Sequence, residues 1–167
     1  MKQFGFRSTC IVVLLAVATS SQAKDEKKSP QVELVRKLYK SFAWETVLYP
    51  ETGETLAEQP KGVLRDYFDD ELAALLASDA ECAKKRNICR LDVDPLFGMR
   101  DPIAHNLEVL PADTAGVVVR FLGVSGGSEA MTEIVIQMGR SGRGGRISDV
   151  VYPNGPSLKT RLTAPLE

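Results

Sequence analysis

Histidine and cysteine are both scarce in this sequence. Its 167 residues include one histidine, His105, and three cysteines, Cys10, Cys82 and Cys89. A zinc site requires four ligands brought together from His, Cys and carboxylate side chains, and these spacings do not offer them. No serine lies in a Gly-x-Ser-x-Gly motif, so the nucleophile elbow of many hydrolases is absent. We therefore expect no metal and no cofactor, and we assign no catalytic residue.

Long apolar runs are also missing, apart from one near the N-terminus. Lys2 and Arg7 precede the apolar run 10–18, and small and polar residues follow as far as Ala23. This pattern predicts a signal peptide over residues 1–23, cleaved after Ala23. The alternative is a membrane anchor, but the run has about half of the roughly 20 apolar residues that span a bilayer. A lipid anchor would require a cysteine at position 24, and Lys24 stands there.

The mature chain is then expected in the periplasm or outside the cell, with no membrane anchor. Residues 24–29 are charged and lack apolar side chains, so we predict a disordered N-terminus before one domain over 30–167. Without Lys2 and Arg7 the chain has 19 basic and 22 acidic residues. This small negative charge gives no reason to expect a nucleic-acid partner.

Two cysteines remain after cleavage, Cys82 and Cys89, with six residues between them. An isolated pair this close is expected to form a disulfide in an oxidising compartment. Two metal-binding thiolates are the alternative, but the sequence has no second cysteine pair to complete such a site.

The hydrophobic periodicity changes along the chain from helical to alternating. Ser29-Pro30 is typical of the start of a helix. The segment 49–62 contains two glycines and two prolines, which indicates a loop. Asp69 and Asp70 interrupt the apolar face of the second helical region, 62–80, so the alternative to one helix is two, 62–68 and 70–80, that meet at a corner. The predicted helices are 30–45 and 62–80, and the predicted antiparallel strands are 104–110, 115–123, 130–139 and 145–152.

Helices followed by strands define an α+β fold, with N-terminal helices packed on a curved antiparallel sheet of about four strands. This order resembles the nuclear-transport-factor-two-like, or cystatin-like, roll, a likeness that concerns the fold alone. The predicted core consists of Val35, Tyr39, Phe42, Phe68, Leu72, Leu75, Val119, Phe121, Ile134, Ile136 and Ile147.

A set of motifs between Tyr67 and Pro102, together with a second set near the C-terminus, resembles the motifs of a known family. They are Tyr67-Phe68, 72–76, Asp79, Cys82, 92–97, Arg100-Asp101-Pro102, 146–152 and Ser157-Leu158. They resemble a family of exported bacterial proteins of unknown function, the domain of unknown function 3828 family. Gly145 stands where the family pattern has a bulky aromatic residue. The resemblance implies a small periplasmic protein with no assigned activity.

The segment from Arg90 to His105 concentrates ionisable residues between the predicted helices and strands. Our candidate residues for binding a ligand or partner are Asp92, Asp94, Arg100, Asp101 and His105. Pro95 and Pro102 stiffen this segment. The alternative is structural, with the aspartates capping turns or pairing with Arg90 and Arg100. The calcium-loop template fails because its twelfth position, 103, is an isoleucine.

Two classes of function stay open. The first is a non-enzymatic binding protein of the bacterial cell envelope, for example an immunity or inhibitor protein, with an unknown periplasmic protein or small ligand as its partner. The second is a pocket enzyme or ligand-binding protein on the same roll, with an aspartate or His105 as acid-base group and a tyrosine hydroxyl as a hydrogen-bond donor. Candidate aromatics are Tyr39, Trp44, Tyr49 and Tyr67. A filled interior favours the first class, and an open pocket with convergent Asp and Tyr favours the second.

Overall fold

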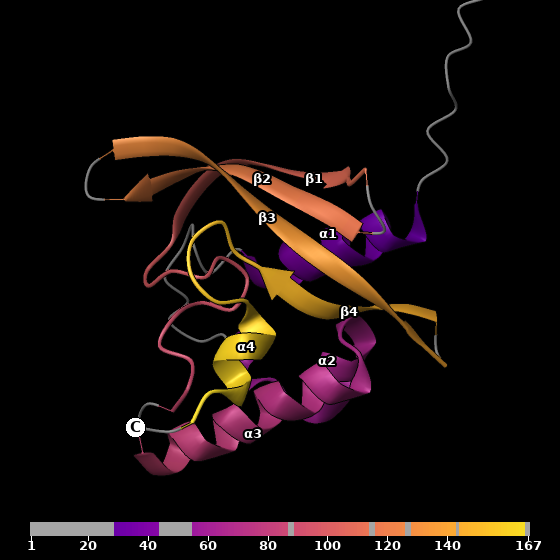
Figure 1. The fold of residues 1–167 in the computed structure, drawn as a ribbon, viewed down its shortest axis with the longest axis vertical. Helices are drawn as coiled ribbons and strands as arrows, with labels where there is room; N and C mark the ends of the chain where they lie inside the picture. Colours follow the sequence, from indigo (N-terminus) through magenta and orange to yellow (C-terminus); the bar gives the residue numbers. More distant parts are fainter. Residues whose placement is uncertain are drawn as a thin grey trace, which may run out of the picture.

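The protein is an α+β domain in which helices come first and a four-stranded antiparallel sheet follows (Figure 1). The computed structural model describes residues 29–43, 55–86, 89–113, 116–125, 128–142 and 144–165. The predicted signal peptide, residues 24–28, Trp44 and Tyr49 lie outside them. The elements are α1 (Pro30–Phe42), the 3₁₀ turn η2 (Leu56–Glu58), α2 (Lys61–Tyr67), α3 (Asp70–Arg86), β1 (Ile103–Pro111), β2 (Gly116–Ser125), β3 (Ser128–Ser141), β4 (Gly144–Val151) and α4 (Leu158–Thr163).

The sheet is a meander in the order β1-β2-β3-β4, in which each strand pairs antiparallel with its neighbour in sequence. Figure 1 shows it curved and twisted over the helices. A bulge interrupts β1 between His105 and Glu108, and Asn106 lies within it at a φ of 53°. A second register shift separates Gln137 from Met138 on β3. Such bulges bend and twist a strand, which fits the curvature of this sheet.

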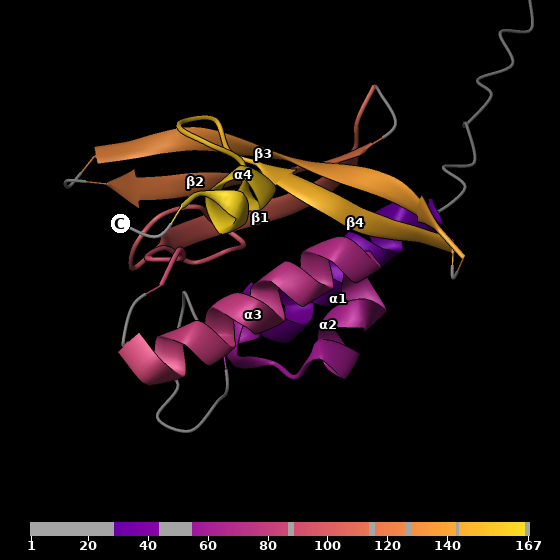
Figure 2. The ribbon, with the colours of Figure 1, turned by 60° about the horizontal axis from the view of Figure 1, so that its bottom comes forward.

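The core lies between one face of the sheet and the helices. Figure 2 shows α1, α2 and α3 on the same side of the sheet. Helix α1 buries Val32, Val35, Leu38 and Tyr39, which follow the helical period. Opposite them lie the inward-facing residues of β2, β3 and β4, each fully buried: Val117, Val119, Phe121, Ile134, Ile136, Ile147 and Val150.

The region 62–80 forms two helices and not one, and the corner between them also closes one edge of the sheet. The Asp69 carboxylate accepts a hydrogen bond from the Leu72 amide at 2.8 Å, so Asp69 caps α3. The Asp69 amide donates to the Ile147 carbonyl at 2.9 Å, and Phe68 forms a parallel bridge with Ile147. The edge strand β4 is therefore paired with the corner.

The predicted α+β class, its four strands and most of its core are confirmed. Phe42 and Leu75 are corrections, since both are only partly buried against the core. Helix α1 ends at Phe42, before the predicted 45, and α3 continues six residues beyond 80 to Arg86. Part of the predicted loop 49–62 forms η2, which buries Leu56. Ser29 occupies the N-cap of α1, as predicted, without a capping bond from its side chain.

Candidate functional site

The predicted site segment is built around a tight turn that begins at Asp94. Asp94 Oδ1 accepts hydrogen bonds from the amides of Leu96 at 2.7 Å and Phe97 at 3.2 Å. The Asp94 carbonyl accepts from the Gly98 amide at 2.7 Å, and Gly98 has a φ of 69°. A side chain at Gly98 would collide with the ring of Tyr152, so this position requires glycine on two counts.

Two tyrosines from distant elements hold this turn from opposite ends of the sequence. The hydroxyl of Tyr39, on α1, donates to the Leu96 carbonyl at 2.7 Å. The hydroxyl of Tyr152, just after β4, donates to the Pro95 carbonyl at 2.8 Å. Both bonds are buried, so the two carbonyls have partners away from water.

Aromatic rings fill the space between α1 and the sheet behind the turn. The rings of Tyr39 and Phe97 meet edge-to-face at 5.8 Å, and those of Phe97 and Phe121 at 5.2 Å. Phe97 is 2% exposed and Phe121 is fully buried. The ring of Phe97 therefore fills the space between α1 and the sheet at this place.

Burial sets the electrostatics of the turn. It raises the pKa of Asp94 from 3.8 to about 6, although the amides of Leu96 and Phe97 favour the carboxylate. Burial also raises the pKa of Tyr39 and of Tyr152, and the nearby Asp94 charge raises both further. Both tyrosines are therefore protonated donors at neutral pH.

The other predicted site residues lie at the surface. Arg100 pairs with Asp92 at 2.5 Å, and this bond lowers the pKa of Asp92. Asp101 is exposed at a φ of 44°, and His105 is exposed on β1 opposite Leu122. Among the described residues no hydrogen bond or ion pair joins Asp94 to Asp101 or His105. Asp92 and Arg100 are thus brought together, and a binding role for the set stays a prediction.

A groove of about 430 Å³ lies elsewhere, between η2 and α3. None of the predicted binding residues lines it. Its lining consists of Thr55, Ala57, Glu58, Leu76, Asp79, Ala80, Ala83, Lys84, Leu91 and Val93.

Asp79 is a buried acidic residue whose role the sequence analysis missed. It is 4% exposed, and its two oxygens accept hydrogen bonds from the amides of Arg90 at 2.8 Å and Leu91 at 3.2 Å. It fixes the chain just beyond the predicted disulfide between Cys82 and Cys89, which is present with a Cα–Cα distance of 5.9 Å. The available signal was an aspartate on the apolar face of a helix, one turn before Cys82.

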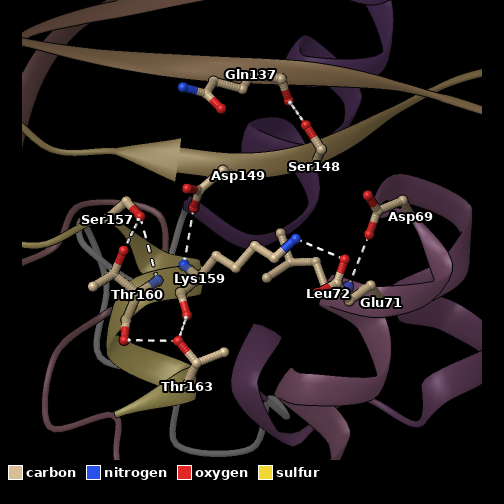
Figure 3. A network of polar contacts seen from close by, with 10 residues as sticks. All are labelled: Asp69, Glu71, Leu72, Gln137, Ser148, Asp149, Ser157, Lys159, Thr160 and Thr163. Carbon is tan, nitrogen blue, oxygen red and sulfur yellow. Dashed lines mark hydrogen bonds and ion pairs between the residues drawn. The ribbon is translucent and has the colours of Figure 1, made fainter.

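A polar network joins α3, β4 and α4, and the sequence analysis missed it as well (Figure 3). Asp149 Oδ1 accepts from the Lys159 amide at 2.9 Å in the first turn of α4. The Lys159 ammonium group pairs with Glu71 at 2.6 Å, which raises the pKa of Lys159. Ser157 caps the same helix by accepting from the Thr160 amide at 3.3 Å. The network attaches the C-terminal helix to the sheet and to α3.

Two features are absent from the described ranges. No three His, Cys, Asp or Glu side chains there are grouped so that they could bind a metal ion. Of the helices in those ranges, none has the length and apolar character needed to cross a bilayer.

No family model matches the chain, and neither a curated protein nor a solved structure does. The resemblance to exported proteins of unknown function therefore stays a prediction that depends on the quoted motifs alone.

Proposed function

We propose that this chain is an exported, non-enzymatic binding protein of the bacterial cell envelope. The observation that carries the proposal is the filled space between α1 and the sheet, where Tyr39, Phe97 and Phe121 pack edge-to-face. A roll enzyme needs an open pocket at this place, with polar groups that converge on a substrate.

The polar groups of this region are already engaged. Tyr39 and Tyr152 donate to backbone carbonyls, and Asp94 Oδ1 accepts two backbone amides. An oxyanion donor or a general base must instead reach a reacting atom. This argues for binding and against the alternative of a pocket enzyme.

The compartment is part of the proposal. A signal peptide over 1–23 and an intrachain disulfide both suit the periplasm. An immunity or inhibitor protein, which occupies a periplasmic toxin or hydrolase, is the version that we favour.

We place the contact surface on the segment from Arg90 to His105. The turn at Asp94 anchors it to the core through Leu96 and Phe97, which are 1% and 2% exposed. Arg100 and Asp101 are exposed beyond this anchor. An anchored segment loses less conformational freedom on binding than a mobile loop does.

The test is capture of partners from the periplasm with the full chain as bait, followed by mass spectrometry. We expect Asp101→Asn and Arg100→Gln to lose a partner that the wild type retains, with unchanged melting temperatures. Asp113→Asn, in an exposed turn between β1 and β2, is the matched control and should retain the partner. Turnover of an ester or phosphate-ester panel by the purified protein, abolished in Asp94→Asn, would overturn the proposal in favour of the enzyme.

A further inference from the structure

The face of the sheet that points away from the helices combines apolar side chains with charged ones. Strand β2 directs Val117, Val119 and Phe121 into the core, so Val118, Arg120 and Leu122 point to the other side. Figure 2 shows α1, α2 and α3 only on the core side. A sheet with one solvated face normally carries polar residues on that face. Here two exposed residues of β3, Met131 and Val135, are 62% and 37% accessible.

The register of the strands arranges the middle of this outer face in three rows, flanked by Ile103, Val124 and Glu129 on one side and by Gln137 and Asp149 on the other. One apolar row crosses all four strands, and another crosses β2 and β3. A charged row lies between them. The first apolar row is Leu110, Val118, Val135 and Val151, the charged row is Glu108, Arg120 and Glu133, and the second apolar row is Leu122 and Met131 beside His105.

The charged row contains an ion pair at the surface of the sheet. Arg120 Nη2 lies 2.7 Å from Glu133 Oε1, and both side chains remain about half accessible, at 40% and 51%. Arg120 is on β2 and Glu133 is directly opposite on β3. Each group therefore keeps donor or acceptor capacity toward a surface placed on the sheet.

We infer that this face binds a second copy of the chain, through a two-fold axis that runs between β2 and β3 and close to parallel with the strands. That axis places β2 of one subunit over β3 of the other. Arg120 then faces the partner subunit's Glu133, Val118 faces the partner subunit's Val135, and Leu122 faces the partner subunit's Met131. Each contact occurs twice, as a two-fold interface requires.

The charges select this axis. A two-fold axis perpendicular to the strands, along the charged row, would stack Arg120 on Arg120 and Glu133 on Glu133 of the partner subunit. Like charges that face each other oppose association, whereas the chosen axis joins two ion pairs into one network.

The area of the face is at the lower end of the range for specific interfaces. Four strands about 4.8 Å apart and roughly ten residues long cover roughly 600 Å² on each subunit, and specific interfaces bury from about 600 to about 1,000 Å² on each partner. Sheets that pack face to face cross at about 30°, which keeps the central rows opposed.

Sedimentation velocity on the purified, oxidised protein over a range of concentrations tests this inference. We expect a species of twice the monomer mass. Arg120→Glu and Glu133→Arg should each weaken dimerisation by about tenfold or more, because like charges then face each other. The double variant restores both pairs and should dimerise nearly as well as the wild type. Met131→Lys should also weaken the dimer, and Ser78→Lys, exposed on α3, is the charge-matched control.

A wild-type protein that stays monomeric throughout would overturn the inference, and so would a double variant as weak as the single ones. Melting temperatures of all variants distinguish loss of dimer from loss of fold. The measurement needs no envelope partner, so its result is independent of the proposed binding function. A dimer that persists in both single charge variants would use another surface and would also refute this one.

Discussion

The hydroxyl of Tyr39 donates a 2.7 Å hydrogen bond to the carbonyl oxygen of Leu96, which lies 57 residues further along the chain. Tyr152 makes the same kind of bond to Pro95, the preceding residue of the turn. Two consecutive carbonyls are therefore held by hydroxyls from the first helix and from the end of the last strand. The segment between the helices and the sheet is fixed by these bonds and by the rings beneath it.

Removal of either hydroxyl should destabilise the fold. Tyr39→Phe and Tyr152→Phe each leave a buried carbonyl without its donor, which costs about 1–2 kcal/mol. Urea denaturation followed by circular dichroism measures this loss. Tyr67→Phe is the control, since the Tyr67 hydroxyl lies 3.4 Å from Ser41 Oγ, at the limit of a hydrogen bond. Equal losses in all three variants would contradict the special role of the turn.

The raised pKa of Asp94 makes stability depend on pH. The folded-state value of about 6 exceeds the ordinary 3.8, so the folded protein binds this proton more tightly than the unfolded chain. The Asp94 contribution to the free energy of unfolding is therefore greatest below about pH 4. It falls by on the order of 2–3 kcal/mol as the pH rises through about 6 and is constant above about pH 7.

Asp94→Asn isolates this effect, because its amide oxygen still accepts the two backbone amides. The free energy of unfolding of the variant, relative to that of the wild type, should increase between pH 4 and pH 7 by on the order of 2–3 kcal/mol. Chemical denaturation at several pH values gives the difference. A difference that is independent of pH would show that the carboxylate is well solvated.

The disulfide prediction concerns both export and stability. Protein recovered from a periplasm should begin at Lys24 and weigh two hydrogens less than its reduced form in intact-mass spectrometry. Closing the short loop between Cys82 and Cys89 is worth roughly 2.5 kcal/mol. The double variant Cys82→Ser/Cys89→Ser should lose about that much, and free thiols in the periplasmic protein would contradict the prediction.

The stability of α4 should depend more on the hydrogen bond that Asp149 accepts in its first turn than on the ion pair between Lys159 and Glu71. Asp149→Ala removes the acceptor of the Lys159 amide and should destabilise α4 by about 1 kcal/mol, whereas Asp149→Asn retains an acceptor. Lys159→Met breaks a solvent-exposed ion pair and should change stability by less than about 0.5 kcal/mol. Hydrogen exchange of the α4 amides reports both effects. Faster exchange in Lys159→Met than in Asp149→Ala would reverse this order of importance.

The local pattern of the sequence was sufficient for most of the fold. Alternation at Val117, Val119 and Phe121 and the glycine-rich connections predict hairpins because both signals act over a few residues. The true end of α3 was also readable, since Lys84 and Arg86 favour the last turn of a helix. Helix α4 has its signal in Ser157, a capping residue, followed by apolar residues one turn apart.

The site was less predictable because its contacts join distant residues. No local period indicates that Tyr152 reaches Pro95, since the bond depends on how β4 ends relative to the turn. Its neighbours Pro95 and Gly98 indicate that Asp94 lies in a turn. Its depth of burial follows from the tertiary packing of Leu96 and Phe97.

The meander has a consequence for the order in which this protein acquires structure. Each strand pairs with the next, so the sheet needs only contacts between near neighbours in sequence. Helix α1 buries its apolar side against strands that the ribosome makes more than 60 residues later. Until then Val35 and Leu38 have no sheet to cover them, and such exposed apolar surface is where chaperones act. The nascent chain therefore cannot complete its fold until its last strand has been made, and an incompletely folded chain is what the proposed export would require.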